Sequence, residues 1–95
     1  MTALERYHAD LREIGCIFCL RWRGIADTPA SLHHVGDPHR RSEWMVVPLC
    51  KPDHQGPLGY HGLGGESGFR ARYKIGEHEL LAWTNEEYVK RRVAR

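Results

Sequence analysis

The pattern of apolar and polar residues predicts a helix at the start of the chain. Apolar side chains recur there at intervals of three and four residues, and so share one helical face: Leu4, Tyr7, Leu11 and Ile14. Thr2 and Glu5 have the spacing of a capping box, and Gly15 is the residue type that most often ends a helix. We therefore expect a helix over residues 2–14.

Two β-favouring runs in the middle of the chain predict a hairpin. "SLHHV" spans residues 31–35 and "EWMVVPL" spans residues 43–49, and the stretch between them, "GDPHRRS", is rich in turn-forming residues. Residues 20–30, which contain glycine and proline, are expected to form a loop. After the second run, Pro52 suits the first turn of a short helix.

The second half of the chain is predicted to be helical after a glycine-rich loop. Residues 66–75 form one expected helix, and Gly76 follows it. Further on, Thr84 and Glu87 have the spacing of a second capping box, which predicts a break near Trp83 and a last helix from about residue 85. The whole order indicates a small α+β fold, and we expect all 95 residues to form one domain.

Composition favours a globular chain outside the membrane. Apolar residues make up 41% and charged residues 27% of the sequence, so disorder is not expected. No apolar run approaches the roughly 20 residues that span a bilayer, and the N-terminus has no apolar stretch of a signal peptide. We expect a cytoplasmic protein. Its small size favours a metal or a partner as an additional source of stability.

The cysteines have the spacing of a structural zinc site. Cys16 and Cys19 form a C-x-x-C unit, and Cys50 precedes Asp53 by three residues, which gives a second pair at the same spacing. Three cysteines cannot complete a set of disulfides, so reduced thiols without a metal are the alternative. The candidates for the fourth zinc ligand are Asp53, His39 and His54.

Arginine supplies 11 of the 14 basic residues, although the formal net charge is only +2. Its planar guanidinium suits bidentate contact with phosphate. Arg40 and Arg41 lie between the two β-favouring runs, and Arg70 and Arg72 lie in the predicted helix over residues 66–75. These four arginines are candidate contacts to a nucleic-acid backbone, with ordinary solvated surface charge as the alternative.

Two motifs resemble the HNH endonucleases. "LHHV" followed at a distance by "VVPLCKPDH" is similar to the two conserved segments of that family, and the upstream "CIFC" is typical of members with a structural zinc. A closer resemblance, to the phage recombination-enhancement (Ref-type) nucleases, extends over nearly the whole chain. It rests on "CIFC", "SLHHVG", "EWMVVPLC", "DHQG", "YHGLG", "FRARY" and "ELLAWT". These are RecA-dependent HNH enzymes that cut DNA in RecA filaments or displacement loops.

The resemblance implies a fold, a reaction and a site. The fold is the ββα-metal unit, a hairpin and a helix around one divalent ion, and the reaction is hydrolysis of a DNA phosphodiester. His34 is implied as the general base, and the implied metal ligands are His33, His54 and His61. We expect the histidine pair where the strand ends, so that His33 reaches the metal while His34 approaches the scissile phosphate from the other side.

The resemblance also implies cofactors, partners and a setting. The cofactors are a structural Zn²⁺ and a catalytic divalent ion. Three imidazoles suit Zn²⁺, Ni²⁺, Co²⁺ or Mn²⁺ better than Mg²⁺, although all five are candidates. The partners are DNA and a RecA filament, in the cytoplasm of a bacterium that carries a phage or prophage.

The sequence departs from the HNH pattern in two places. The middle Asn of the motif falls near Trp44 and Met45, neither of which has an amide, and Asp53 stands where many relatives have Cys or His. A non-catalytic, zinc-bound module that binds DNA or protein is therefore the alternative function.

Overall fold

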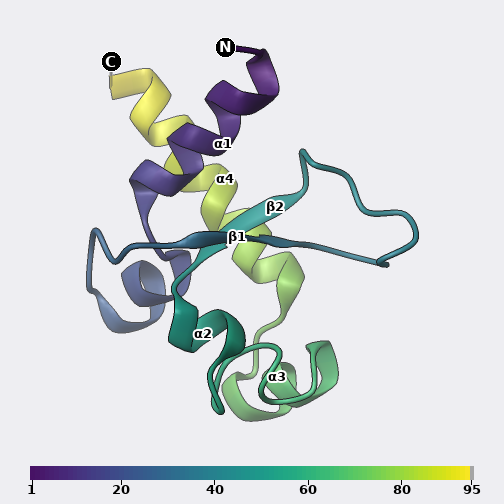
Figure 1. Ribbon diagram of the computed structural model, residues 1–95. Coiled ribbons are helices and arrows are strands. Elements are labelled where there is room, and N and C mark those ends of the chain that lie inside the picture. Colours follow the sequence, from purple (N-terminus) through teal and green to yellow (C-terminus); the bar gives the residue numbers. More distant parts are fainter. Residues whose placement is uncertain (95) are drawn as a thin grey trace.

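The structure is a computed structural model and describes residues 1–94; Arg95, in the basic C-terminal segment, lies outside them. Two antiparallel strands lie at its centre, with α1 and the C-terminal half of α4 side by side at one end and α2 and α3 at the other (Figure 1). The elements are α1 (Ala3–Ile14), η1 (Cys19–Arg23), β1 (Ser31–His34), β2 (Val46–Leu49), α2 (Lys51–Gln55), α3 (Glu66–Tyr73) and α4 (Glu77–Ala94). This is the predicted α+β class. Within residues 1–94 no helix is both long enough and apolar enough to cross a membrane.

Helix α1 begins and ends where the sequence predicts. The Thr2 hydroxyl accepts a hydrogen bond from the Glu5 backbone N–H at 3.1 Å, and the Glu5 carboxylate accepts one from the Thr2 N–H at 3.0 Å, which confirms the capping box. Gly15 ends the helix with a φ of 80°, and a Cβ there would lie 2.9 Å from the Thr28 carbonyl oxygen. Glycine is therefore required at this position by both backbone conformation and space. The tight turn brings the chain directly to Cys16.

The predicted hairpin is present, with a shorter second strand than expected. Strands β1 and β2 pair antiparallel, with His33 opposite Val47, and every residue of β2 is buried. Residues 43–45, which the sequence assigned to the strand, belong to the connecting loop instead, and only a backbone hydrogen bond from Val35 to Met45 extends the ladder. Helix α2 follows at once, with Pro52 in its first turn as predicted. The chain order strand, strand, helix thus places the histidine pair opposite a buried strand.

The segment after Cys19 is helical rather than a loop. Residues Cys19–Arg23 form a single turn of π-helix, which Gly24 ends with a φ of 72°. The expected loop therefore begins only after Gly24. Arg23 is the last residue of this turn, and its guanidinium donates a hydrogen bond to Asp53 at 2.8 Å.

The predicted break near Trp83 is wrong, because α4 runs without interruption from Glu77 to Ala94. Thr84 is fully buried, and its hydroxyl donates to the Leu80 carbonyl oxygen at 2.8 Å instead of capping a new helix. A threonine can satisfy its hydroxyl inside a helix in this way. The spacing of Thr84 and Glu87 alone cannot show whether the threonine hydroxyl caps a new helix or bonds to a carbonyl within one.

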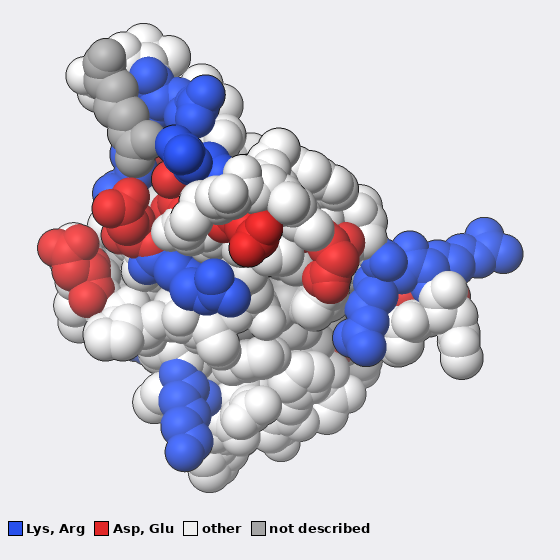
Figure 2. All heavy atoms as spheres, turned by 45° about the horizontal axis from the view of Figure 1, so that its top comes forward, with Lys and Arg blue, Asp and Glu red and all other residues white. Residues whose placement is uncertain are grey.

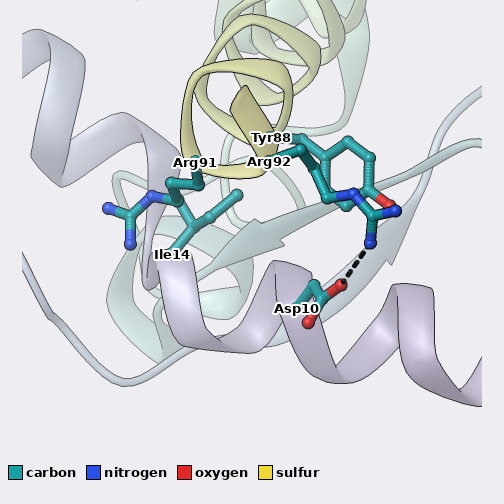
Figure 3. Close-up of a pocket in the computed structure, with 5 residues that line it drawn as sticks. All are labelled: Asp10, Ile14, Tyr88, Arg91 and Arg92. Carbon is teal, nitrogen blue, oxygen red and sulfur yellow. Dashed lines mark ion pairs between the residues drawn. The ribbon is translucent and has the colours of Figure 1, made fainter. Parts of the chain in front are cut away.

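Contacts between α1 and α4 join the two ends of the described chain. Tyr7 and Tyr88 meet edge to face with ring centroids 5.1 Å apart. Arg92 reaches back toward Asp10, with an N–O distance of 4.0 Å, across the groove between the two helices (Figure 3). Beneath these helices the largest fully buried side chains form one core with β2 and α3 and include Phe18, Phe69, Leu11, Ile17, Leu49 and Leu80.

Candidate metal centres

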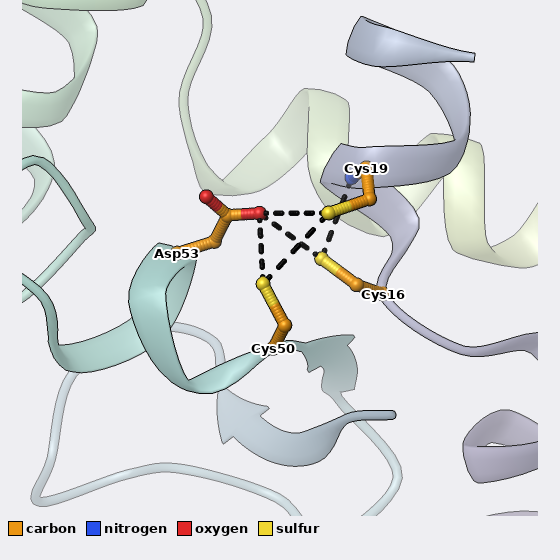
Figure 4. A group of neighbouring side chains, drawn as sticks. All are labelled: Cys16, Cys19, Cys50 and Asp53. Atoms are coloured by element: carbon orange, nitrogen blue, oxygen red, sulfur yellow. Dashed lines mark hydrogen bonds between the residues drawn. The ribbon is translucent and has the colours of Figure 1, made fainter. Parts of the chain in front are cut away.

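Three cysteines and one aspartate converge on a buried centre, here called the cysteine centre (Figure 4). Cys16 and Cys19 come from the turn after α1 and the start of the π-helix, whereas Cys50 and Asp53 come from the N-terminal end of α2. One oxygen of Asp53, Oδ2, lies 3.3 Å from the sulfur of Cys16, 3.3 Å from that of Cys19 and 3.1 Å from that of Cys50. These are the four residues whose spacing predicts a zinc site. Within residues 1–94, the histidines considered as alternative fourth ligands do not join this group.

The geometry of the cysteine centre fits a tetrahedral cation. Zinc–thiolate bonds of about 2.3 Å at tetrahedral angles separate two sulfurs by about 3.8 Å, and the sulfurs of Cys19 and Cys50 are 3.8 Å apart. All four residues are buried. Soft thiolates with one carboxylate are a donor set that Zn²⁺ accepts. The arrangement has the closed character of a structural site, since four protein ligands leave no open position.

Without a metal, the surroundings of this centre favour the protonated thiols of Cys16 and Cys50, because burial raises the pKa of both. Burial, followed by the hydrogen bond to Asp53, raises the pKa of the Cys50 thiol to about 11. Burial opposes ionisation of Asp53 too, but hydrogen bonds from Arg23 and the thiols outweigh it and lower the pKa of that carboxyl. A divalent ion would hold the thiols as thiolates. Arg23, 2.8 Å from Asp53 and 3.4 Å from the Cys19 sulfur, would offset part of the surplus negative charge.

A second group, here called the histidine centre, consists of His33, His54 and His61. His33 lies on β1, His54 in the last turn of α2, and His61 in the loop that follows. Each offers a ring nitrogen, and these nitrogens lie within 4.8 Å of one another. The Nε2 atoms of His54 and His61 are 3.2 Å apart, close to the separation of about 3.3 Å for two imidazoles on one tetrahedral ion. The three predicted catalytic-metal ligands therefore meet at one place.

The histidine centre is more open than the cysteine centre. His33 is buried, His54 is intermediate and His61 is exposed. Burial, followed by the nearby rings of His33 and His61, lowers the pKa of His54 to about 4. His54 is therefore a neutral imidazole over the physiological range, which is the form that binds a metal. Three neutral nitrogen ligands beside solvent can hold a divalent ion and leave a coordination position for a substrate.

His34 lies next to this centre but makes a different contact. It is the last residue of β1, so the histidine pair does lie at the end of the strand as expected. Its Nε2 atom is 2.5 Å from one oxygen of Glu43 and 3.1 Å from the other, whereas the His33 ring faces His54 and His61. His34 remains partly exposed, with a side-chain accessibility of 29%. A ring held by a carboxylate at one nitrogen keeps its other nitrogen available as a base.

The four candidate DNA-binding arginines have different surroundings. Arg40 and Arg41 are exposed in the loop between β1 and β2, which extends away from the rest of the molecule (Figure 1). Arg70 pairs with Glu66 at 3.1 Å and Glu79 at 3.3 Å, and the Arg72 guanidinium lies 5.8 Å from the centre of the Tyr73 ring. On the face shown in Figure 2, basic side chains form separate groups with acidic ones between them. Charge therefore favours Arg40 and Arg41 over Arg70 as contacts for a phosphate.

Sequence reasoning missed three residues that contact the two centres or the neighbouring His34, namely Arg23, Glu43 and Glu77. Arg23 bonds Asp53, Glu43 bonds His34, and Glu77 bonds His33 with an N–O distance of 2.7 Å. Each lies between 9 and 44 positions from its partner. Arg23 and Glu77 belong to no quoted motif, and Glu43 opens the motif "EWMVVPLC" without any sign that it contacts His34. The three contacts therefore become visible only in the three-dimensional packing of η1, the hairpin loop and α4.

Comparison with known proteins gives one result. A family model described as recombination enhancement, RecA-dependent nuclease matches residues 1–89, which is nearly all of the chain. No curated protein and no solved structure matches it. The matched range contains both centres and every residue discussed above as a ligand or a base.

Proposed function

Because the chain belongs to the family of recombination-enhancement, RecA-dependent nucleases, we propose that it is a metal-dependent DNA endonuclease of the HNH type. Membership of this family supports a nuclease function. The observation that carries the finer proposal is the histidine centre, in which a strand, a helix and a loop supply three nitrogens to one place beside His34. The proposed metals are a structural Zn²⁺ at the cysteine centre and a catalytic divalent ion at the histidine centre.

The proposed roles follow from chemistry and position. A divalent ion at the histidine centre would act as a Lewis acid toward a phosphate oxygen. His33, His54 and His61 would hold that ion as neutral imidazoles. His34 would take the proton from the attacking water, since its second ring nitrogen stays free while Glu43 fixes the ring. Glu43 would thus help to orient the base, a task to which the middle Asn contributes in the HNH enzymes that the chain resembles.

The proposed substrate is DNA, engaged together with a RecA filament, as the family description suggests. Arg40 and Arg41 would contact backbone phosphates from the hairpin loop, and Arg70 and Arg72 would extend the contact. We further propose that the protein acts in the cytoplasm of a bacterium carrying a phage or prophage. The bacterial cell follows from the proposed RecA partner, and the phage or prophage follows from the resemblance to phage nucleases.

The deciding experiment is a cleavage assay on duplex, single-stranded and displacement-loop DNA, with and without RecA filaments. Each reaction is run with Mg²⁺, Mn²⁺, Co²⁺, Ni²⁺ or Zn²⁺. We expect cleavage that depends on the added metal and is strongest in the presence of RecA. DNA binding without cleavage under all these conditions would contradict the proposal and favour the non-catalytic, zinc-bound module.

A further inference from the structure

The carboxylate of Glu77 contacts the most deeply buried ligand of the histidine centre. We propose that Glu77 is a positioning residue that orients His33 toward the catalytic metal ion, an inference that rests on the proposed function. Glu77 is the first residue of α4 and lies 44 positions after His33. The helix that ends the described chain would therefore be part of the support for the site.

The contact between the two side chains is short and sheltered from solvent. Nε2 of His33 lies 2.7 Å from Oε2 of Glu77, and the accessibilities of the two side chains are 4% and 13%. The other oxygen of Glu77 accepts a hydrogen bond from the Gly36 backbone N–H at 3.3 Å. One carboxylate thus holds both a ring on β1 and the backbone just beyond the strand. Rotation of His33 would break the first contact, and displacement of the strand end would break the second.

Glu77 is itself held in place by a second carboxylate. Its backbone N–H donates to Oε1 of Glu66 at 3.0 Å, and the same oxygen accepts a hydrogen bond from the Tyr60 hydroxyl at 3.3 Å. The Tyr60 ring in turn lies against the His33 ring, with centroids 4.5 Å apart. Glu66 belongs to α3 and Tyr60 to the glycine-rich loop, so two separate parts of the chain help to fix the position of Glu77.

Two observations favour a positioning role over direct ligation. Among residues 1–94, the side chains whose ligand atoms lie within 4.8 Å of one another at this centre are three histidines, and Glu77 is not one of them. A carboxylate that accepts the N–H of one imidazole nitrogen leaves the other nitrogen unprotonated, as a metal requires. Metal-bound histidines in proteins commonly have such an outer partner. Glu77 fits this role because it contacts His33 alone of the three ligands.

Cobalt binding tests the inference without reference to activity. Protein carrying one Zn²⁺ per chain at the cysteine centre is titrated with Co²⁺, and the visible absorption is recorded. Wild type should bind one Co²⁺ without a thiolate charge-transfer band. Glu77→Gln preserves the shape of the side chain and should bind Co²⁺ about 10- to 100-fold more weakly, with the band positions unchanged. The matched control is Glu86→Gln, which removes an exposed carboxylate of α4 that pairs with Arg21.

Each outcome of the titration supports or overturns the inference. Weaker binding by Glu77→Gln alone, at an unchanged melting temperature before cobalt is added, supports it. Wild-type affinity in Glu77→Gln overturns it, as does a melting temperature that falls while affinity stays constant. Weaker binding with shifted bands would make Glu77 a ligand, which also overturns a positioning role. If wild type binds no Co²⁺ apart from ions at the cysteine centre, the proposed catalytic centre itself is wrong. If wild type binds Co²⁺ at the histidine centre and Glu77→Gln binds it equally well, only the role of Glu77 is wrong.

Discussion

The two candidate metal centres share α2, which supplies Asp53 to one and His54 to the other, and they differ in their exposure to solvent. All four residues of the cysteine centre are buried, whereas in the histidine centre His33 is buried, His54 is intermediate and His61 is exposed. Structural zinc sites are closed by four protein ligands, and catalytic sites keep one position open. A single short helix thus contributes one residue to a centre suited to holding the chain together and the next residue to a centre suited to reaching a substrate.

The interactions that hold the two centres in place also differ. Cys16, Cys19 and Cys50 are themselves part of the hydrophobic core. The histidine centre is held instead by side-chain hydrogen bonds from helices that pack around it, such as the bond from His33 to Glu77. The comparison predicts that damage to the first centre unfolds the protein, whereas damage to the second removes function and leaves the fold.

The largest effect is expected from Cys19→Ser. Cys19 is 7% exposed and contacts both Cys50 and Asp53, so its loss removes a ligand from the closed centre. Binding of structural zinc contributes about 10–16 kcal/mol in small zinc domains, and a domain this small has a total stability of only about 5–15 kcal/mol. We expect the variant to be unfolded at 25 °C, by circular dichroism and zinc content.

The matched variant for Cys19→Ser is one that removes a ligand from the histidine centre instead. His61→Ala removes one ligand from the histidine centre at an exposed position, and it should retain both the fold and the bound zinc. If Cys19→Ser melts at the wild-type temperature with its zinc still bound, or if His61→Ala unfolds, the division into a structural and a functional centre is wrong.

Chelation should separate the two centres in a single sample. EDTA reaches the open histidine centre first, so metal-dependent cleavage should disappear while the circular dichroism spectrum stays unchanged. Zinc held by buried thiolates should leave much more slowly, because the centre must open before a chelator can reach it. Elemental analysis alongside the cleavage assay measures both steps. Simultaneous loss of zinc, fold and activity would remove the distinction between the centres.

His34→Ala should reduce cleavage and leave both metals in place. A positioned general base contributes about 10²- to 10⁴-fold to a rate, and His34 lies outside both clusters of ligands. We expect a loss of that size in the turnover number, with zinc content and cobalt affinity at wild-type values. The control is His78→Ala, an exposed histidine of α4. Equal rates for His34→Ala and wild type would show that another group is the base.

The sequence predicted the cysteine centre more completely than the support of the histidine centre, and the reason is the range of the contacts. Cys16 with Cys19, and Cys50 with Asp53, are pairs within one helical turn, so their spacing alone places them together. The hairpin then joins the two pairs. The resemblance to known motifs implies the three histidines as ligands, and the structure places one ring nitrogen of each within 4.8 Å of the others.

The features that the sequence did not predict depend on packing between distant segments. Glu77 looks like any acidic residue in a first helical turn, and it becomes important only because α4 begins beside β1. The hydroxyl of Thr84 can cap a helix or bond within one, and the buried position of Thr84 inside α4 decides for the second. Arg23 reaches Asp53 through a turn of π-helix that no residue pattern indicated.

The smallest effect is expected at the start of α4, where Glu79 holds the turn that carries Glu77. Oε2 of Glu79 accepts a hydrogen bond from the Gly76 backbone N–H at 3.1 Å, and backbone hydrogen bonds lower the pKa of this carboxyl from the ordinary value of 4.5. The folded protein therefore binds a proton at Glu79 less readily than the unfolded chain. The resulting stabilisation is present above pH 4.5 and is lost as the pH falls through the lower folded pKa.

Glu79→Gln should consequently melt below wild type at pH 7, by less than about 4 °C, and the difference should shrink toward zero as the pH is lowered to about 3. The comparison is made on melting temperatures of the two proteins at matched pH, so that acid effects on the metal ligands cancel. A difference that is constant with pH would show that the Glu79 carboxylate does not stabilise the start of α4. A loss of zinc at pH 7 in this variant would show that the cysteine centre also depends on the start of α4. The two centres would then not be held in place by different parts of the molecule.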